Sequence, residues 1–135
     1  MPFFVSWLCS ERVIYARVTG LVTMEEVTGY NTELVRYVTS GEAPVHTVLH
    51  HDNITRIPRD VLSIRRALTV LDNPGMGWVV HVSQKRSPWL YAGLLMSRMT
   101  GSLGHTTTTI QDALTFLSNQ DYTLPQLQWR SAGDD

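Results

Sequence analysis

Histidine is the most chemically versatile side chain in this sequence, and all five histidines fall in or beside segments that read as β-strands. They are His46, His50, His51, His81 and His105. His50 and Asp52 are two residues apart and would face the same way along a strand, where His81 and His105 could approach them from neighbouring strands. A zinc site would need three or four such ligands at about 2 Å from one ion. Because no HExxH motif or paired Cys/His spacing is present, we expect no metal site and interpret the histidines as bonded to backbone or solvent.

Nucleophilic catalysis and nucleotide binding have little support in the sequence. Neither GxSxG nor SxxK occurs, and Ser63 falls in the middle of a predicted helix with no evident base. The glycine-rich phosphate loops GxGxxG and GxxxxGK[ST] are missing. Cys9, the single cysteine, reads as an ordinary thiol near a turn. We therefore expect a protein that is not an enzyme and that has no cofactor.

Four basic residues form the most distinctive electrostatic feature. Arg56 and Arg59 lie beside the predicted start of one helix, and Lys85 and Arg86 precede the start of the next. Both helices should begin at the same edge of a parallel sheet, where free backbone N–H groups and helix dipoles favour an anion. The sequence thus predicts an anion-binding site at this edge. The alternative is an ordinary solvated rim in which Asp52 and Asp60 pair with the cations.

The composition is that of one soluble globular domain. The chain has 135 residues, of which 43% are hydrophobic and 17% charged, and its formal net charge is −1. This balance gives no overall field that would favour nucleic acid. No apolar run approaches the roughly 20 residues that span a bilayer, and the N-terminus lacks the basic region of a signal peptide. A single cysteine fits a reducing compartment, so we expect a cytoplasmic protein with no membrane span.

The elements that would position these residues alternate along the chain. Strands are predicted at 3–8, 13–18, 45–50, 78–82 and 105–108. Helices are predicted from the capping box Thr23–Glu26 to about residue 39, over about 59–71 with Pro58 in the first turn, from Pro88 to before Gly101, and after Thr109. Val48 and its neighbours form a short apolar run that is typical of a strand buried on both faces.

This order predicts an α/β fold with one open mixed sheet of about five strands and about four helices. The first two strands should form an antiparallel hairpin, and the remaining strands should be mainly parallel, with helices covering the sheet. We assign residues 1–120 to the domain and 121–135 to a C-terminal tail that lacks periodicity.

The element order and four local patterns resemble the STAS superfamily, the SpoIIAA-like domains of anti-sigma-factor antagonists, in its divergent STAS/SEC14-like branch. The patterns are 13–20 before the capped helix, 48–52 followed by Ile54 and Ile57-Pro58, the strand at 77–80, and 110–117. The resemblance covers about residues 3–120.

The resemblance implies a non-enzymatic regulatory or protein-interaction module. In signalling members a kinase phosphorylates a serine at the start of the helix after the central strand, which releases a partner. Here the matching turn reads Ile57-Pro58-Arg59-Asp60, with Thr55 and Ser63 as the nearest hydroxyls, so we expect no serine phosphoswitch. The expected partner is an unidentified protein, with a homodimer or a small anionic ligand (a nucleotide or a lipid headgroup) as alternatives.

Overall fold

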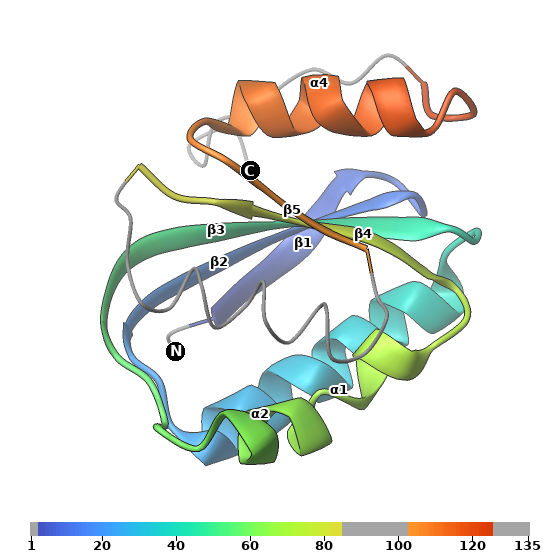
Figure 1. Ribbon diagram of the computed structural model, residues 1–135. Coiled ribbons are helices and arrows are strands. Elements are labelled where there is room, and N and C mark those ends of the chain that lie inside the picture. The colour runs from blue at the N-terminus through green and yellow to red at the C-terminus, as the bar shows by residue number, and fades with distance from the viewer. Residues whose placement is uncertain (1–2, 85–102, 126–135) are drawn as a thin grey trace.

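The computed structural model describes residues 3–84 and 103–125, which form a five-stranded sheet with helices on both faces (Figure 1). The strands lie in the order β1-β2-β3-β4-β5. Their bounds are β1 Phe3–Cys9, β2 Val13–Leu21, β3 Val45–Arg56, β4 Met76–Val82 and β5 Gly104–Thr107. β1 and β2 are antiparallel, and every other neighbouring pair is parallel. The predicted α/β fold with an N-terminal hairpin and an otherwise parallel sheet is confirmed.

Three α-helices and one 3-10 turn cover the sheet in the described residues. They are α1 Met24–Ser40, α2 Val61–Ala67, the 3-10 turn η1 Thr69–Asp72 and α4 Ile110–Gln120. Figure 1 shows α1 and α2 against one face of the sheet and α4 against the other. The helix predicted from Pro88 lies outside the described residues. No helix in 3–84 or 103–125 has the length and apolar character needed to cross a membrane.

Local capping signals set two of the helix starts. The Thr23 hydroxyl accepts the Glu26 amide while the Glu26 carboxylate accepts the Thr23 amide, so the predicted capping box is present in α1. In α4 the Thr109 hydroxyl accepts the Asp112 amide. Each bond satisfies a backbone N–H that has no partner within its own helix.

The second helix starts later and is shorter than the sequence predicts. β3 continues to Arg56 because its end still pairs with β2, where Leu21 lies opposite Arg56. Pro58 then favours an extended residue before it, and α2 begins at Val61 with Asp60 as its N-cap. The predicted helix over about 59–71, with Pro58 in its first turn, is therefore corrected to 61–67.

A buried side chain explains why α2 gives way to a 3-10 turn. Asn31 in α1 accepts the backbone N–H of Val70 at 2.9 Å and donates to the Thr69 hydroxyl at 2.9 Å. With its N–H committed to α1, Val70 has no donor left for a continued α-helix, and residues 69–72 form η1 instead.

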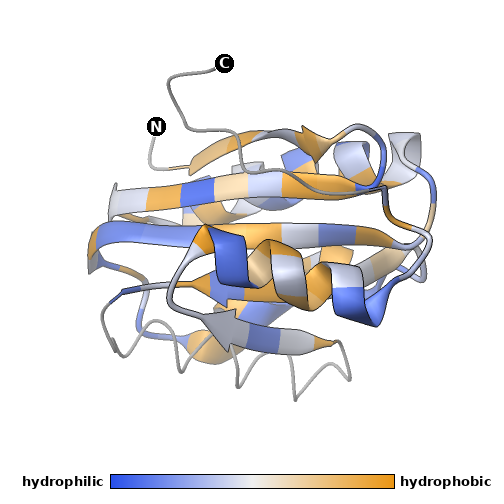
Figure 2. Ribbon diagram, turned by 90° about the horizontal axis from the view of Figure 1, so that it is seen from above, coloured by the Kyte–Doolittle hydropathy of each residue, from blue (hydrophilic) through white to orange (hydrophobic). Residues whose placement is uncertain are grey.

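The core lies in two layers because side chains alternate between the faces of each strand. Figure 2 shows apolar and polar residues alternating along the strands. One layer, between the sheet and α1, contains the fully buried Ile14 and Ala16 of β2 and the nearly buried Leu34. The other, beneath α4, contains the fully buried Val13 and Val48. The sheet separates these two environments, and each histidine belongs to one of them.

Candidate functional site

The predicted anion site is described only in part. Arg56 ends β3 and Arg59 follows in the connection to α2, and both are exposed. In residues 3–84 and 103–125 neither guanidinium has an ion-pair partner. Lys85 and Arg86 lie outside the described residues, so the convergence of the four cations stays a prediction.

The N-terminus of α2 already holds a carboxylate. Asp60 accepts the Ser63 amide at 3.2 Å and the Ser63 hydroxyl at 2.7 Å. These hydrogen bonds lower the pKa of Asp60, so it is ionised at neutral pH. An external anion near Arg59 would therefore meet a helix start that is capped by the chain's own negative charge.

The later start of α2 also changes the position of Ser63. It is the third residue of the helix rather than a mid-helix residue, so the first turn does contain a hydroxyl. The expectation that this turn lacks a hydroxyl is therefore wrong, because it rested on a helix start at Pro58. The hydroxyl is held by the Asp60 carboxylate.

A groove lies along the outer strand β1, which pairs only with β2 among the described strands. Its volume is about 660 Å³. We call it the β1 groove, and its lining residues are Phe3, Phe4, Val5, Glu25, Glu26, Gly29, Tyr30, Thr32 and Glu33. The described lining thus has three carboxylates and no cation, next to apolar side chains of β1.

Among the described strands β1 has no outer neighbour, although one of its carbonyls already has a partner from α1. The Tyr37 hydroxyl of α1 donates to the Val5 carbonyl at 3.3 Å. Strand residues whose polar backbone groups point away from their partner strand can pair with an additional strand. Phe4 is 43% exposed and gives the groove an apolar rim.

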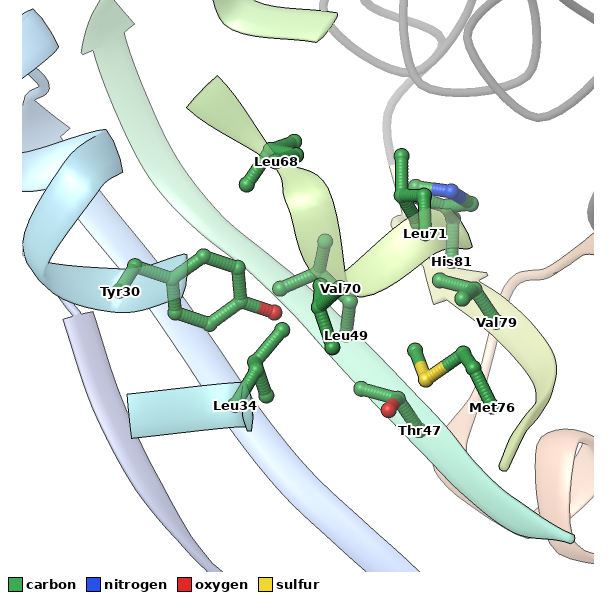
Figure 3. Close-up of a pocket in the computed structure, with 10 residues that line it drawn as sticks. All are labelled: Tyr30, Leu34, Thr47, Leu49, Leu68, Val70, Leu71, Met76, Val79 and His81. Atoms are coloured by element: carbon green, nitrogen blue, oxygen red, sulfur yellow. The ribbon is translucent and has the colours of Figure 1, made fainter. Parts of the chain in front are cut away.

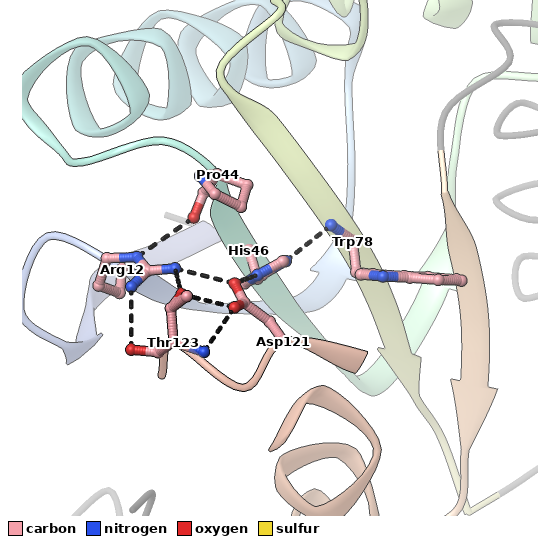
Figure 4. Close-up of polar contacts among 6 residues, drawn as sticks. All are labelled: Arg12, Pro44, His46, Trp78, Asp121 and Thr123. Atoms are coloured by element: carbon pink, nitrogen blue, oxygen red, sulfur yellow. Dashed lines mark hydrogen bonds and ion pairs between the residues drawn. The ribbon is translucent and has the colours of Figure 1, made fainter. Parts of the chain in front are cut away.

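A polar network lies where β3 begins, at the opposite end of this strand from Arg56 (Figure 4). The Asp121 carboxylate, one residue past α4, lies 2.8 Å from the Arg12 guanidinium and 2.9 Å from Nε2 of His46. Arg12 also donates to the Thr123 hydroxyl at 2.9 Å. Although burial raises the pKa of Asp121, hydrogen bonds from His46 and Thr123 and the charge of Arg12 outweigh it, and the pKa is about 2.

Sequence reasoning did not find this network. Asp121 is 109 residues from Arg12 and 75 from His46, and it lies in the segment predicted to be a tail. The one local signal is Gly77. A Cβ there would lie 2.4 Å from Nδ1 of His46, so the glycine leaves room for the imidazole.

The sequence left open that His81 and His105 approach His50 and Asp52, and we interpreted the histidines as bonded to backbone or solvent, whereas most of them contact other side chains. His51 on β3 lies 3.0 Å from His81 on β4, joined Nε2 to Nδ1. His50 instead contacts the Tyr15 hydroxyl on the opposite face of the sheet, and His105 stacks on Phe116. Within 3–84 and 103–125 no group of three metal-ligating side chains comes together.

Burial keeps the His51–His81 pair uncharged at neutral pH. His81 is 4% exposed, and desolvation lowers its pKa to about 3. Desolvation also lowers the pKa of His51 to about 4, with a smaller effect of His50. The pair lies on the α1 face of the sheet and lines a mostly apolar cavity.

Comparison with known proteins places this architecture among SpoIIAA-like folds. An uncharacterised protein of the DUF3478 family from Shewanella loihica, described as having a SpoIIAA-like fold, superposes with a TM-score of 0.65 at 12% identity, over 85% of this chain and 93% of that chain. The anti-sigma factor antagonist SpoIIAA in its unphosphorylated form gives a TM-score of 0.54 at 13% identity, over 85% and 96%. No family model matches the sequence, and no curated protein matches it. The chain therefore has a STAS or SpoIIAA-like fold.

Proposed function

We propose that this domain is a non-enzymatic module that binds another protein through the β1 groove. The similarity in fold to a protein named as an anti-sigma factor antagonist supports a regulatory role through protein contacts. The observation that carries the proposal is the groove itself, about 660 Å³ beside a strand that has no outer neighbour in the described sheet.

The chemistry of the groove favours an extended, basic segment of the partner. An extended segment can add to β1 through main-chain hydrogen bonds and place alternate side chains in the groove. Glu25 would then face its lysines or arginines, as would Glu33, which also pairs with Arg36 at 3.1 Å, while Phe4 and Val5 contact its apolar side chains. Complementary charge of this kind raises the association rate and rejects acidic competitors.

The module works without a serine phosphoswitch in this proposal. The Ser63 hydroxyl donates to Asp60, and a phosphate there would lie against a carboxylate. In this proposal the protein is cytoplasmic and binds its partner without control by phosphorylation. The amount of complex then depends on the concentration of the partner, or on an anion bound near Arg56 and Arg59. The histidines support a non-catalytic role, since His46 and the His51–His81 pair are committed to internal hydrogen bonds.

Charge reversal in the groove tests the proposal. Wild-type protein and the double variant Glu25→Lys, Glu33→Lys are used as bait for affinity purification from the native cell, with mass spectrometry. We expect a protein with a basic segment to be retained by the wild type and lost from the variant. Glu11→Lys with Glu42→Lys is the matched control, because both residues are exposed, neither lines the groove and the change of charge is equal.

Two results would contradict the proposal. One is equal retention by the groove variant and the wild type. The other is equal loss in the groove variant and the control, which would point to net charge rather than to this surface. A homodimer through β1 would appear as a doubled mass of the wild type in solution and would replace the heterologous partner.

A further inference from the structure

The α1 side of the β1 groove has a gap between two acidic side chains. Glu25, Gly29 and Glu33 all line the groove and follow one another at intervals of four residues in α1. Residues four apart lie on the same face of a helix, about 6 Å apart along its axis. Glu25 and Glu33 therefore stand one helical turn to either side of Gly29, which has no side chain. We call the space above Gly29 the Gly29 gap.

In the described part of the chain no atom fills the Gly29 gap, and packing fixes the wall beside it. A Cβ built on Gly29 meets nothing within 4 Å, and the residue is exposed. The next residue, Tyr30, is only 8% exposed, and its ring stacks on Phe3 of β1 with the centroids 4.3 Å apart. Figure 3 shows the Tyr30 hydroxyl directed into the interior, toward Val70 and Leu49. The gap is thus open to an incoming side chain and bordered by a held aromatic pair.

The two-residue repeat of an extended chain matches the spacing along α1. Alternate side chains of a strand point to the same side and lie about 6.6 Å apart, close to the rise of about 6 Å between helix residues four apart. Three alternate residues of an extended segment in the groove would therefore lie opposite Glu25, the Gly29 gap and Glu33 in turn. The residues between them would point away from α1.

The carboxylates at the two ends favour a lysine or arginine at each outer position. Glu25 is exposed and has no ion-pair partner among the described residues. Glu33 pairs with Arg36 at 3.1 Å, but the Arg36 side chain is 73% exposed. An ion pair that is exposed to solvent contributes little to stability, so a cation of the partner can replace Arg36 at low cost.

We propose that the β1 groove selects an extended segment with a basic, a large apolar and a second basic residue at alternate positions, and that Gly29 determines the choice of the middle residue. The middle side chain enters the Gly29 gap and packs against Phe3 and Val5. This inference rests on the proposed function of the groove and narrows the partner. Side chains carry the selectivity because the Val5 carbonyl, which an added strand would use, already accepts the Tyr37 hydroxyl.

Random peptides displayed on phage test the pattern. They are selected on the wild type and depleted on the variant Glu25→Lys with Glu33→Lys. We expect the remaining peptides to share the basic and apolar residues at alternate positions. One such peptide is then compared with a copy in which the apolar residue has changed places with its neighbour. This copy has the same composition but points the apolar side chain away from α1, and should bind about tenfold more weakly or worse.

Two substitutions of Gly29 test its role. Gly29→Leu fills the gap and should weaken the selected peptide by about tenfold or more, since the middle side chain loses its buried position. Gly29→Ala is the matched control, because it adds one methyl group and should change the affinity by less than about fourfold. Both replacements favour the helix over glycine, so neither should lower the melting temperature. Fluorescence polarisation of the labelled peptide measures the Kd, and thermal unfolding shows that both variants are folded.

The inference is overturned if the selected peptides are basic but have no apolar residue at the middle position, or if Gly29→Leu binds as tightly as the wild type. In either case the proposed function of the groove still stands, because basic peptides are still lost on charge reversal. If no peptide distinguishes the wild type from the charge-reversed variant, the proposed function fails and this inference fails with it. A doubled mass of the protein without peptide, reduced by the selected peptide, would place a second copy in the groove and would also overturn the inference.

Discussion

The backbone N–H of Trp78 donates a hydrogen bond of 2.9 Å to Nδ1 of His46. Because this nitrogen accepts, the proton of the neutral ring is on Nε2, which lies 2.9 Å from the Asp121 carboxylate. Burial lowers the pKa of His46, although Asp121 acts in the opposite direction. His46 is therefore an uncharged bridge between the first residues of β3 and β4 and the segment after α4.

Removing the charge of Asp121 should loosen this bridge. Asp121→Asn keeps the shape but leaves the Arg12 guanidinium and the His46 N–H facing a neutral amide. Hydrogen bonds to a charged group contribute about 2 kcal/mol, so we expect the free energy of unfolding in urea to fall by about that amount. Asp112→Asn, at an exposed position of α4, is the control and should cost less than about 1 kcal/mol. Equal losses in the two variants would show that the bridge adds no stability.

Replacing Gly77, which lies beside His46, should destabilise the protein, whereas replacing Gly29 should not. A Cβ on Gly77 would lie 2.4 Å from Nδ1 of His46, so Gly77→Ala must displace the ring from Trp78 and Asp121. We expect a loss of about 2–3 kcal/mol, as for overpacking in a core. Gly29 on α1 is exposed and has no atom within 4 Å of a built Cβ, so Gly29→Ala should stabilise the helix by about 0.5–1 kcal/mol. Urea unfolding of the two variants measures both changes in stability. If Gly77→Ala is as stable as the wild type, the close packing of Gly77 against His46 is contradicted.

Acid should destabilise the protein through the His51–His81 pair. Unfolded histidines bind protons near pH 6.5, whereas burial lowers the folded pKa of His51 to about 4 and that of His81 to about 3. Below pH 6.5 the unfolded state thus binds more protons, and stability falls with pH until about pH 4. Above pH 7 both histidines are neutral in the folded and in the unfolded state, so the pair adds no pH dependence to the stability. Each histidine contributes a slope of about 1.4 kcal/mol per pH unit.

Urea unfolding at pH 7, 6 and 5 measures this slope for the wild type and for His81→Phe. The variant should lose the His81 share of the pH dependence. A wild type whose stability is the same at pH 7 and pH 5 would contradict the burial of the pair.

The fold could be predicted because its signals are local. The Thr23–Glu26 capping box and the apolar run around Val48 each fix an element within a few residues. The start of α2 could not be predicted this way, because Pro58 and Asp60 are competing start signals. Their competition is settled by a distant contact, the pairing of Arg56 with Leu21 of β2.

The site residues were harder to predict than the fold. His51 meets His81 because it shares a face with Leu49, which lies opposite His81 in the register of β3 and β4. A slip of one residue would place His50 there instead, and the sequence does not reveal which register is adopted. The Asp121 contacts join residues at opposite ends of the chain. They depend on how α4 packs against the sheet, which no local sequence pattern predicts.

The predicted anion site at Arg56, Arg59, Lys85 and Arg86 can be tested by thermal unfolding. We expect inorganic phosphate to raise the melting temperature and added sodium chloride to weaken the effect. Arg59→Ala with Arg86→Ala should abolish the shift. Arg36→Ala with Arg65→Ala removes the same charge elsewhere and should retain it. If phosphate, nucleotides and phospholipid headgroups all leave the wild type unchanged, the site does not exist.

The last prediction is that phosphorylation of Ser63 does not switch this domain. Ser63 is in the first turn of α2, where backbone N–H groups would favour a phosphate. Its hydroxyl, however, donates to Oδ2 of Asp60 at 2.7 Å. A phosphate with nearly two negative charges would repel this carboxylate and displace it as the N-cap, which costs about 1 kcal/mol. The Asp60 carboxylate and a phosphate on Ser63 cannot both occupy the start of α2 without a loss of stability.

Intact mass and phosphopeptide mapping of protein from the native cell should therefore find Ser63 unmodified. Ser63→Glu should melt at a lower temperature than Ser63→Ala, because its carboxylate faces Asp60, and both variants should retain the protein partner. Thr55 is an exposed hydroxyl on β3 and must be mapped in the same experiment. Substantial phosphate on Ser63 or Thr55, together with loss of the partner, would show that the switch operates here. In that case Asp60 would have to leave the helix start on phosphorylation, and Asp60→Asn should make Ser63 a better kinase substrate.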